Sequence, residues 1–111
     1  VSKTIVGLHD LAPTFIEAAG AEPMPHMDAR SLWNVLRGQS ESNRKAIVCG
    51  LNEWRIACDG RYKLVETPSE KLFFDLEKDP DEISPLSVES PDRVVDPFKT
   101  LERIIREAGS P

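Results

Sequence analysis

Cysteine and histidine are scarce in this chain of 111 residues, and each shortage excludes a class of small protein. Two cysteines, Cys49 and Cys58, cannot form the network of bridges that holds a disulfide-rich domain together. The only histidines, His9 and His26, do not have the spacing of zinc ligands. We therefore expect neither a disulfide scaffold nor a structural zinc site.

Long apolar segments and basic clusters are also missing. The apolar runs are short and interrupted, which excludes a transmembrane helix. The net charge is −5 and no basic stripe is present, so we expect neither nucleic acid nor a membrane as a partner. The opening, VSKTIVGL, has no initiator Met and no signal-peptide layout, so we expect a piece of a longer protein.

The first 38 residues predict a strand and two helices. TIVGL at 4–8 is typical of a short buried strand. Asp10 is expected to cap a helix over 11–19, because Pro13 falls in its first turn and Gly20 suits its end. Ser31 can cap a second short helix that stops at Gly38.

The rest of the chain predicts a small antiparallel sheet of three to four strands under a helix. Alternating residues indicate strands at 45–51, 54–58, 62–66 and 71–76. A helix begins at Asp96, carries an apolar stripe and stops at Gly109, and we expect it to cover the sheet. The fold class is therefore α+β, with one unit at 1–38 and another at 39–111.

Two strand registers can be proposed from the turns. A tight turn centred on Glu53 and Trp54 would set Cys49 opposite Cys58, as two adjacent, buried and reduced thiols. The connection at Asp59-Gly60 favours a three-residue loop that puts Ile56, Tyr62 and Leu64 on one face.

The acidic stretch LFFDLEKDPDE at 72–82 raises the question of a calcium loop. From Asp75 the first four alternate positions are acidic, but position 6 is Pro80 and position 12 is Leu86. Proline cannot adopt the positive φ of that loop, and leucine offers no oxygen. We therefore interpret the stretch as a strand that runs into an Asp-Pro turn.

Taken together, three segments resemble the C-terminal region of sulfatases, which are arylsulfatase-like members of the alkaline phosphatase superfamily. Residues 8–38 are similar to the D-L-x-P-T helix followed by D-G-x-S-L. DGRYKLV at 59–65 resembles G-R-Y-K-L, and 72–82 resembles L-Y-D-L-x-x-D-P-x-E. Ala29 replaces the usual glycine, and Pro85-Leu86 stands where N-L is common.

The resemblance implies that the chain contributes to two parts of a longer enzyme. Residues 1–38 would be the last strand and helices of its α/β catalytic core, and 39–111 a C-terminal subdomain. The family's C-x-P-S-R motif, which yields formylglycine, is absent here, so no catalytic residue and no metal ligand can be assigned in this chain. The full-length parent would resemble calcium-dependent formylglycine sulfatases. Its location is open, with the periplasm, secretion and the lysosome as possibilities.

Three residues are candidate substrate contacts. His26 lies in a loop that, by the resemblance, faces the substrate cleft, and Trp54 with Arg55 could meet an anionic sugar. For His9, Asp10 and Arg61 we expect structural roles. Partners would be the catalytic domain and, through surface that truncation exposes, a second copy. The alternative function is a free-standing, non-enzymatic interaction module.

Overall fold

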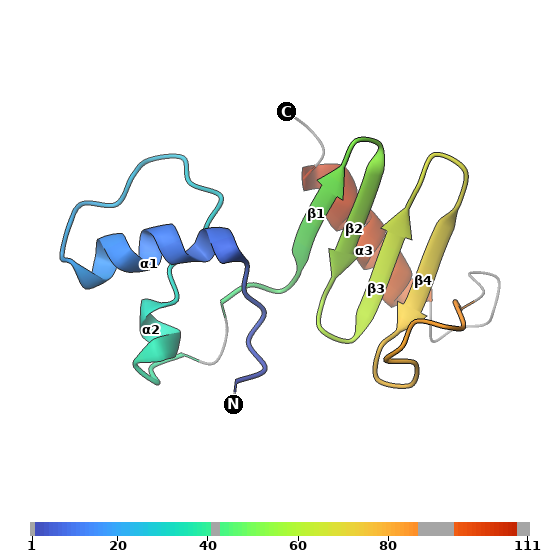
Figure 1. Ribbon diagram of the computed structural model, residues 1–111, viewed down its shortest axis with the longest axis horizontal. Helices are drawn as coiled ribbons and strands as arrows, with labels where there is room; N and C mark the ends of the chain where they lie inside the picture. The colour runs from blue at the N-terminus through green and yellow to red at the C-terminus, as the bar shows by residue number, and fades with distance from the viewer. Residues whose placement is uncertain (1, 41–42, 87–94, 109–111) are drawn as a thin grey trace. The chain divides into compact units, whose positions relative to one another are not determined.

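The computed structural model describes residues 2–40, 43–86 and 95–108, and the chain divides into two compact units (Figure 1). The first comprises Val1–Lys45 and the second Ala46–Pro111. Each unit is described separately below. None of the described helices is long and apolar enough to cross a membrane.

The first unit is built from helices and loops. A 3-10 turn, Leu8–Asp10, leads directly into α1, Leu11–Ala18, and a short helix α2 spans Trp33–Leu36. Gly20 lies just past the end of α1, and its φ of 71° allows the N–H of Ala21 to reach the carbonyl of Ile16 at 3.0 Å. The predicted ends of both helices at Gly20 and Gly38 are confirmed, since both glycines have positive φ.

The strand expected at 4–8 is not formed. Residues 2–7 have no regular secondary structure, and Leu8 already belongs to the 3-10 turn. A strand exists only where a neighbouring backbone pairs with it. The four strands of the described chain all belong to one sheet in the second unit, and residues 4–8 pair with none of them. The apolar residues of 4–8 are therefore not sufficient to form a strand.

The second unit is a four-stranded antiparallel sheet in the order β1-β2-β3-β4 (Figure 1), which confirms the predicted small antiparallel sheet. Each strand pairs with the next one along the chain. The strands are β1 (Ile47–Leu51), β2 (Trp54–Cys58), β3 (Tyr62–Glu66) and β4 (Lys71–Asp75).

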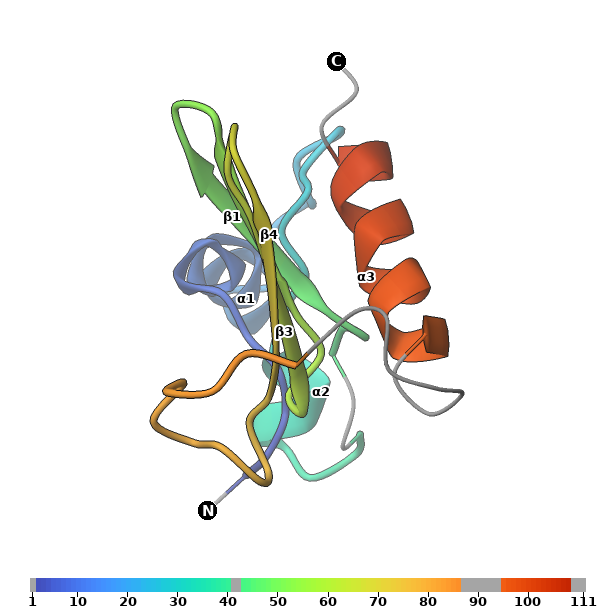
Figure 2. The same cartoon turned by 90° about the vertical axis from the view of Figure 1, so that its right-hand side faces the viewer.

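Helix α3, Val95–Ala108, covers one face of this sheet, as Figure 2 shows from the side. Phe98, Leu101 and Ile105 lie on its buried stripe, at spacings that bring them to one side of a helix. They pack on the sheet residues Ala57, Leu64 and Phe73. The predicted cover is therefore confirmed, although Asp96 lies inside the helix and Gly109 falls outside the described residues.

The predicted register between β1 and β2 is wrong. Leu51 pairs with Trp54, so the turn residues are Asn52 and Glu53, and Cys49 lies opposite Ile56. Asn52 has a φ of 54°, which asparagine tolerates better than most residues and Trp would not. The two cysteines are free and share a face, but Cys49 is exposed and Cys58 is only half-buried.

The predicted bulged loop between β2 and β3 is also wrong. Cys58 pairs with Lys63 and Ile56 with Val65, so Ile56 does not share a face with Tyr62 and Leu64. The tight turn is centred on Gly60 and Arg61, with Gly60 at a φ of 96°. Asp59 fixes it by accepting the N–H groups of Arg61 and Tyr62 at 2.9 and 2.7 Å.

Candidate functional site

Asp10 lies at the centre of the polar contacts of the first unit. Its side chain is fully buried and accepts the N–H of Gly7 and the N–H of Arg30, each at 2.8 Å. It also accepts Nδ2 of Asn43 at 3.1 Å and an ion-pairing hydrogen bond from Arg44. Asp10 occupies the N-cap position of α1, as expected, but its side chain makes no cap hydrogen bond to that helix. The carboxylate instead joins distant segments.

Electrostatics favour the ionised form of this carboxyl. Burial by itself raises the pKa of Asp10. The N–H groups of Arg30 and Gly7 and the guanidinium of Arg44 outweigh that effect and hold the pKa below its ordinary value of 3.8. His9 Nε2 lies 3.6 Å from the same carboxylate and is half exposed, at the edge of the cluster.

Thr14, one turn after Asp10, fastens the loop that follows α1. Its hydroxyl donates to the carbonyl of Asp10 at 2.6 Å and accepts the N–H of Leu32 at 2.7 Å. Asp10 and Thr14 are the first and last residues of DLAPT, and Arg30 and Leu32 belong to DARSL. The side chains of the first motif therefore hold the backbone of the second, a role that spacing alone did not reveal.

The loop between α1 and α2 lines a groove together with α1, and the volume of this groove is about 670 Å³. Apolar side chains make up most of its lining, including Ile16, Met24 and Met27. His26 is exposed at this groove and has a φ of 62°, an uncommon conformation for a residue other than glycine. Glu17 and Ser31 are polar residues that line the same groove as His26.

Trp54 and Arg55 do not form a joint site. As consecutive residues of β2 they point to opposite faces of the sheet. Arg55 Nη1 donates to the carbonyls of Asn52 and Trp54 at 2.7 and 2.8 Å, so this guanidinium holds its own hairpin. Trp54 is 53% exposed beside a shallow apolar hollow.

The acidic stretch of the second unit is held by local contacts. Asp75 is buried and pairs with Arg61 at 3.3 Å, and its pKa is lowered because Arg61 and the N–H of Glu77 outweigh the effect of burial. Asp79 accepts the N–H groups of Ile83 and Ser84. These bonds support the interpretation of this stretch as a strand followed by a turn.

Arg61 and Lys63, both from the DGRYKLV motif, form ion pairs with the acidic stretch at 72–82. Lys63 pairs with Glu82 at 2.6 Å, and Arg61 also reaches Glu77 at 3.4 Å. Within residues 2–40, 43–86 and 95–108, no group of three or more His, Cys, Asp or Glu side chains could hold a metal ion.

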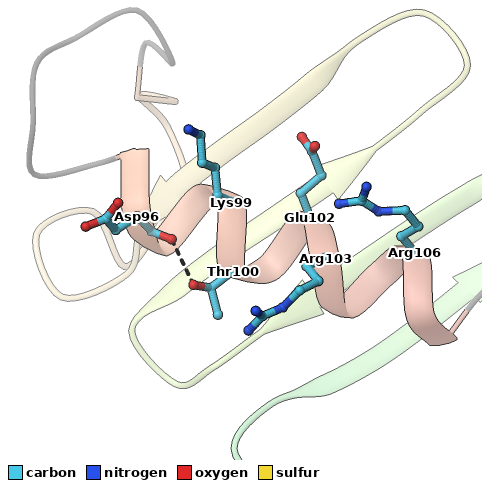
Figure 3. Close-up of a pocket in the computed structure, with 6 residues that line it drawn as sticks. All are labelled: Asp96, Lys99, Thr100, Glu102, Arg103 and Arg106. Atoms are coloured by element: carbon cyan, nitrogen blue, oxygen red, sulfur yellow. Dashed lines mark hydrogen bonds between the residues drawn. The ribbon is translucent and has the colours of Figure 1, made fainter.

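A second hollow, of about 460 Å³, lies along the outer face of α3 (Figure 3). Lys99, Arg103 and Arg106 alternate there with Asp96 and Glu102. Glu102 is bonded to Lys71 of β4 at 3.1 Å, which raises the pKa of that lysine. Charges of both signs on largely exposed side chains are typical of a solvated helix face rather than a ligand site.

The fold of the chain is that of a segment found in sulfatases, which confirms the fold that the resemblance implies. One similar structure is BT4656, in complex with its substrate D-glucosamine-2-N,6-O-disulfate, with a TM-score of 0.75 and 23% identity. The match covers 89% of this chain and 23% of BT4656.

A second similar structure is BT1596, a 2-O GAG sulfatase, with a TM-score of 0.71 and 19% identity. It is covered to the same extent, so the chain spans about a quarter of the length of both proteins. No protein-family model matches the chain, and no curated protein matches it.

Proposed function

We propose that the chain is the C-terminal part of a sulfatase, an enzyme that hydrolyses sulfate esters. The observation that carries the proposal is the likeness to BT4656 over 89% of the chain. The order of the three sequence motifs supports it independently. In this proposal the chain supplies scaffold and one border of the substrate cleft, and its partner is the catalytic domain of the same enzyme.

A sulfated sugar is the substrate class that the comparisons support best. BT4656 has a disulfated glucosamine as substrate, and BT1596 is a sulfatase of glycosaminoglycans. We extend this class to the enzyme that would contain the present chain.

Nucleophile and metal would come from the catalytic domain. Sulfate ester hydrolysis needs a nucleophile, a cation beside the developing negative charge and an acid for the leaving group. The resemblance implies that formylglycine and calcium supply the first two. Cys49 begins CGLN and Cys58 begins CDGR, so neither residue begins a C-x-P-S-R motif.

His26 is the residue of this chain that we propose as a substrate contact. Uncommon backbone conformations are found preferentially at functional sites, and His26 combines one with exposure beside a groove. A neutral or protonated imidazole can donate to a sugar hydroxyl or a sulfate oxygen. Trp54 remains a second proposed contact. We do not propose Arg55, because its guanidinium already donates to the carbonyls of Asn52 and Trp54 in its own hairpin.

The experiment that tests the proposed function begins with the reading frame upstream. We expect it to continue and to encode C-x-P-S-R or its serine version. The full product, expressed with formylglycine maturation and calcium, should release sulfate from sulfated glucosamine and not from glucosamine phosphate. An in-frame stop codon directly upstream, or an upstream region without the motif, would contradict the proposal and favour the interaction module.

The His26 contact is tested in that full-length enzyme. His26→Ala should raise KM for the sulfated sugar about tenfold, a loss of roughly 1.4 kcal/mol of binding, with kcat little changed. Asp28→Ala, an exposed residue of the same loop, is the matched control and should leave both constants unchanged. Equal effects of the two variants would show that the loop, and not the imidazole, matters.

A further inference from the structure

Helix α1 buries a polar residue and exposes apolar ones. Thr14 is its buried residue, and the hydroxyl of Thr14 bonds the carbonyl of Asp10 and the N–H of Leu32. Leu11 and Phe15 are 40% and 66% exposed, and their spacing of four residues places them on one side of the helix. A surface helix normally turns its apolar stripe toward a core. Within the described part of the first unit, nothing covers this stripe.

The stripe lies on a different side of α1 from the groove described above. Ile16 and Glu17 are among the residues of α1 that line that groove, whereas Leu11 and Phe15 are not. Leu8, in the 3-10 turn directly before α1, is 88% exposed and extends the apolar surface toward the N-terminus. We call Leu8, Leu11 and Phe15 the α1 face.

The first unit cannot bury the α1 face by itself. It comprises Val1–Lys45, and Leu32 is the single buried hydrophobic side chain among its described residues. Units of this size seldom form a sufficient core of their own. The bonds of Asp10 and Thr14 nevertheless hold α1 to the loop that follows it. The α1 face is therefore a preformed surface that a partner would complete.

The comparisons indicate a partner of sufficient size. The match to BT4656 leaves only about 12 residues of this chain unmatched, so it includes most of the first unit. It covers 23% of BT4656, so about three-quarters of that protein is additional chain. BT1596 has the same proportions. A segment with this fold therefore occurs in proteins that contain far more chain than the segment itself.

We infer that the α1 face is the surface on which the catalytic part of the parent enzyme packs. The inference rests on the proposed function and adds the face at which the two parts of that enzyme meet. The partner surface is apolar, because the α1 face carries no charged side chain that would need a counter-charge. Permanently buried interfaces are the more hydrophobic ones, which favours a partner in the same chain over a transient one.

Cysteine labelling at Phe15 tests the inference in this chain and in the full-length product of its reading frame. The tryptic peptide that spans 4–30 contains no native cysteine, so its mass reports only the introduced thiol. In Phe15→Cys we expect a mono-maleimide to react at least about tenfold more slowly in the full-length product, because a covered side chain reacts only after opening. Glu17→Cys, on another side of α1, is the matched control and should react at similar rates in both proteins.

Sulfatase activity of the unsubstituted full-length product separates failure of this inference from failure of the proposed function. Activity with rapid labelling at position 15, or equal protection at positions 15 and 17, would overturn the inference alone. Protection at position 15 only, without activity, would support the α1 face and contradict the proposed function. Protection already present in this chain would assign the face to the second unit or, where it grows with concentration, to a second copy, and would overturn the inference. A stop codon directly upstream would overturn both.

Hydroxyl-radical oxidation of the unsubstituted proteins provides a test that does not depend on the folding of Phe15→Cys. Oxidation of Phe15 should be at least about threefold lower in the full-length product than in this chain. Met24, which is 61% exposed and lines the groove, is the internal control and should be oxidised to a similar extent in both. Equal oxidation of Phe15 in the two proteins would overturn the inference.

Discussion

The side chain of Asp10 accepts hydrogen bonds from four residues in three separate stretches of the first unit, namely Gly7, Arg30 and the adjacent pair Asn43 and Arg44. That unit buries a single hydrophobic side chain among its described residues, Leu32. Hydrophobic burial therefore defines little of its structure, and the directional bonds of Asp10 and Thr14 determine which segments meet. The sequence identifies both residues as members of a motif, but the partners that join separate stretches lie 18 to 34 residues away and leave no local signal.

Replacement of Asp10 by Ala should unfold the first unit selectively. It removes the acceptor of all four bonds and leaves Arg44, whose side chain is only 12% exposed, without its counter-charge. Breaking such a pair costs about 3–5 kcal/mol, which exceeds what one small unit can lose. The measurement is the fluorescence of Trp33 in a Trp54→Phe background. Asp28→Ala is the control, and an equal loss of signal there would contradict the special role of Asp10.

The same carboxyl predicts a pH dependence. Its pKa in the folded chain lies below the ordinary value of 3.8, so the unfolded chain binds the proton more tightly. The stabilisation is therefore complete above about pH 5 and is lost as the pH falls through the folded-state pKa. The amide signals of Thr14 and Leu32 should report a decline of the folded population below about pH 4. In Asp10→Asn the population should be lower at neutral pH and should show little of this decline.

At the scale of elements, the strands are predictable and their registers are not. Alternation located all four strands to within one or two residues, because each has one face under α3 or the turn segments. Register depends on which residues adopt positive φ in the turns, and these are Asn52 and Gly60. Asn52 was a usable signal, since asparagine favours such turns, whereas the choice between two- and three-residue loops at Gly60 had no local determinant.

Gly50→Ala should destabilise the second unit by about 1–3 kcal/mol. The new Cβ would meet the carbonyl oxygen of Trp54, a backbone atom that cannot move away as a flexible side chain could. Chemical unfolding followed by far-UV circular dichroism measures the change. Cys49→Ala, one residue earlier on the same strand and exposed, is the control and should stay within about 0.5 kcal/mol of the parent chain. Equal stability of both variants would show that the hairpin can relax.

For the whole molecule, the motifs allowed the sulfatase resemblance to be recognised, and the structure shows what several of their residues do. In the first unit, side chains of the DLAPT motif accept hydrogen bonds from the backbone of the DARSL motif. In the second unit, Arg61 and Lys63 form ion pairs with residues of the acidic stretch. These contacts are structural. The chain alone should therefore show no turnover of an aryl sulfate with calcium present, and activity that survives repurification and scales with protein concentration would contradict this.

The two units should also differ in stability. The core of the second unit combines α3 with three sheet residues, whereas exposed apolar side chains such as Leu8, Phe15 and Leu36 outnumber the buried one in the first. Burial of apolar area is the main source of stability, so the first unit should unfold at a urea concentration lower by about 1 M or more. Each unit contains one tryptophan, Trp33 in α2 and Trp54 in β2, so single-tryptophan variants made by Phe replacement report the units separately. Coincident transitions from both probes would instead show that the two units unfold as one cooperative body.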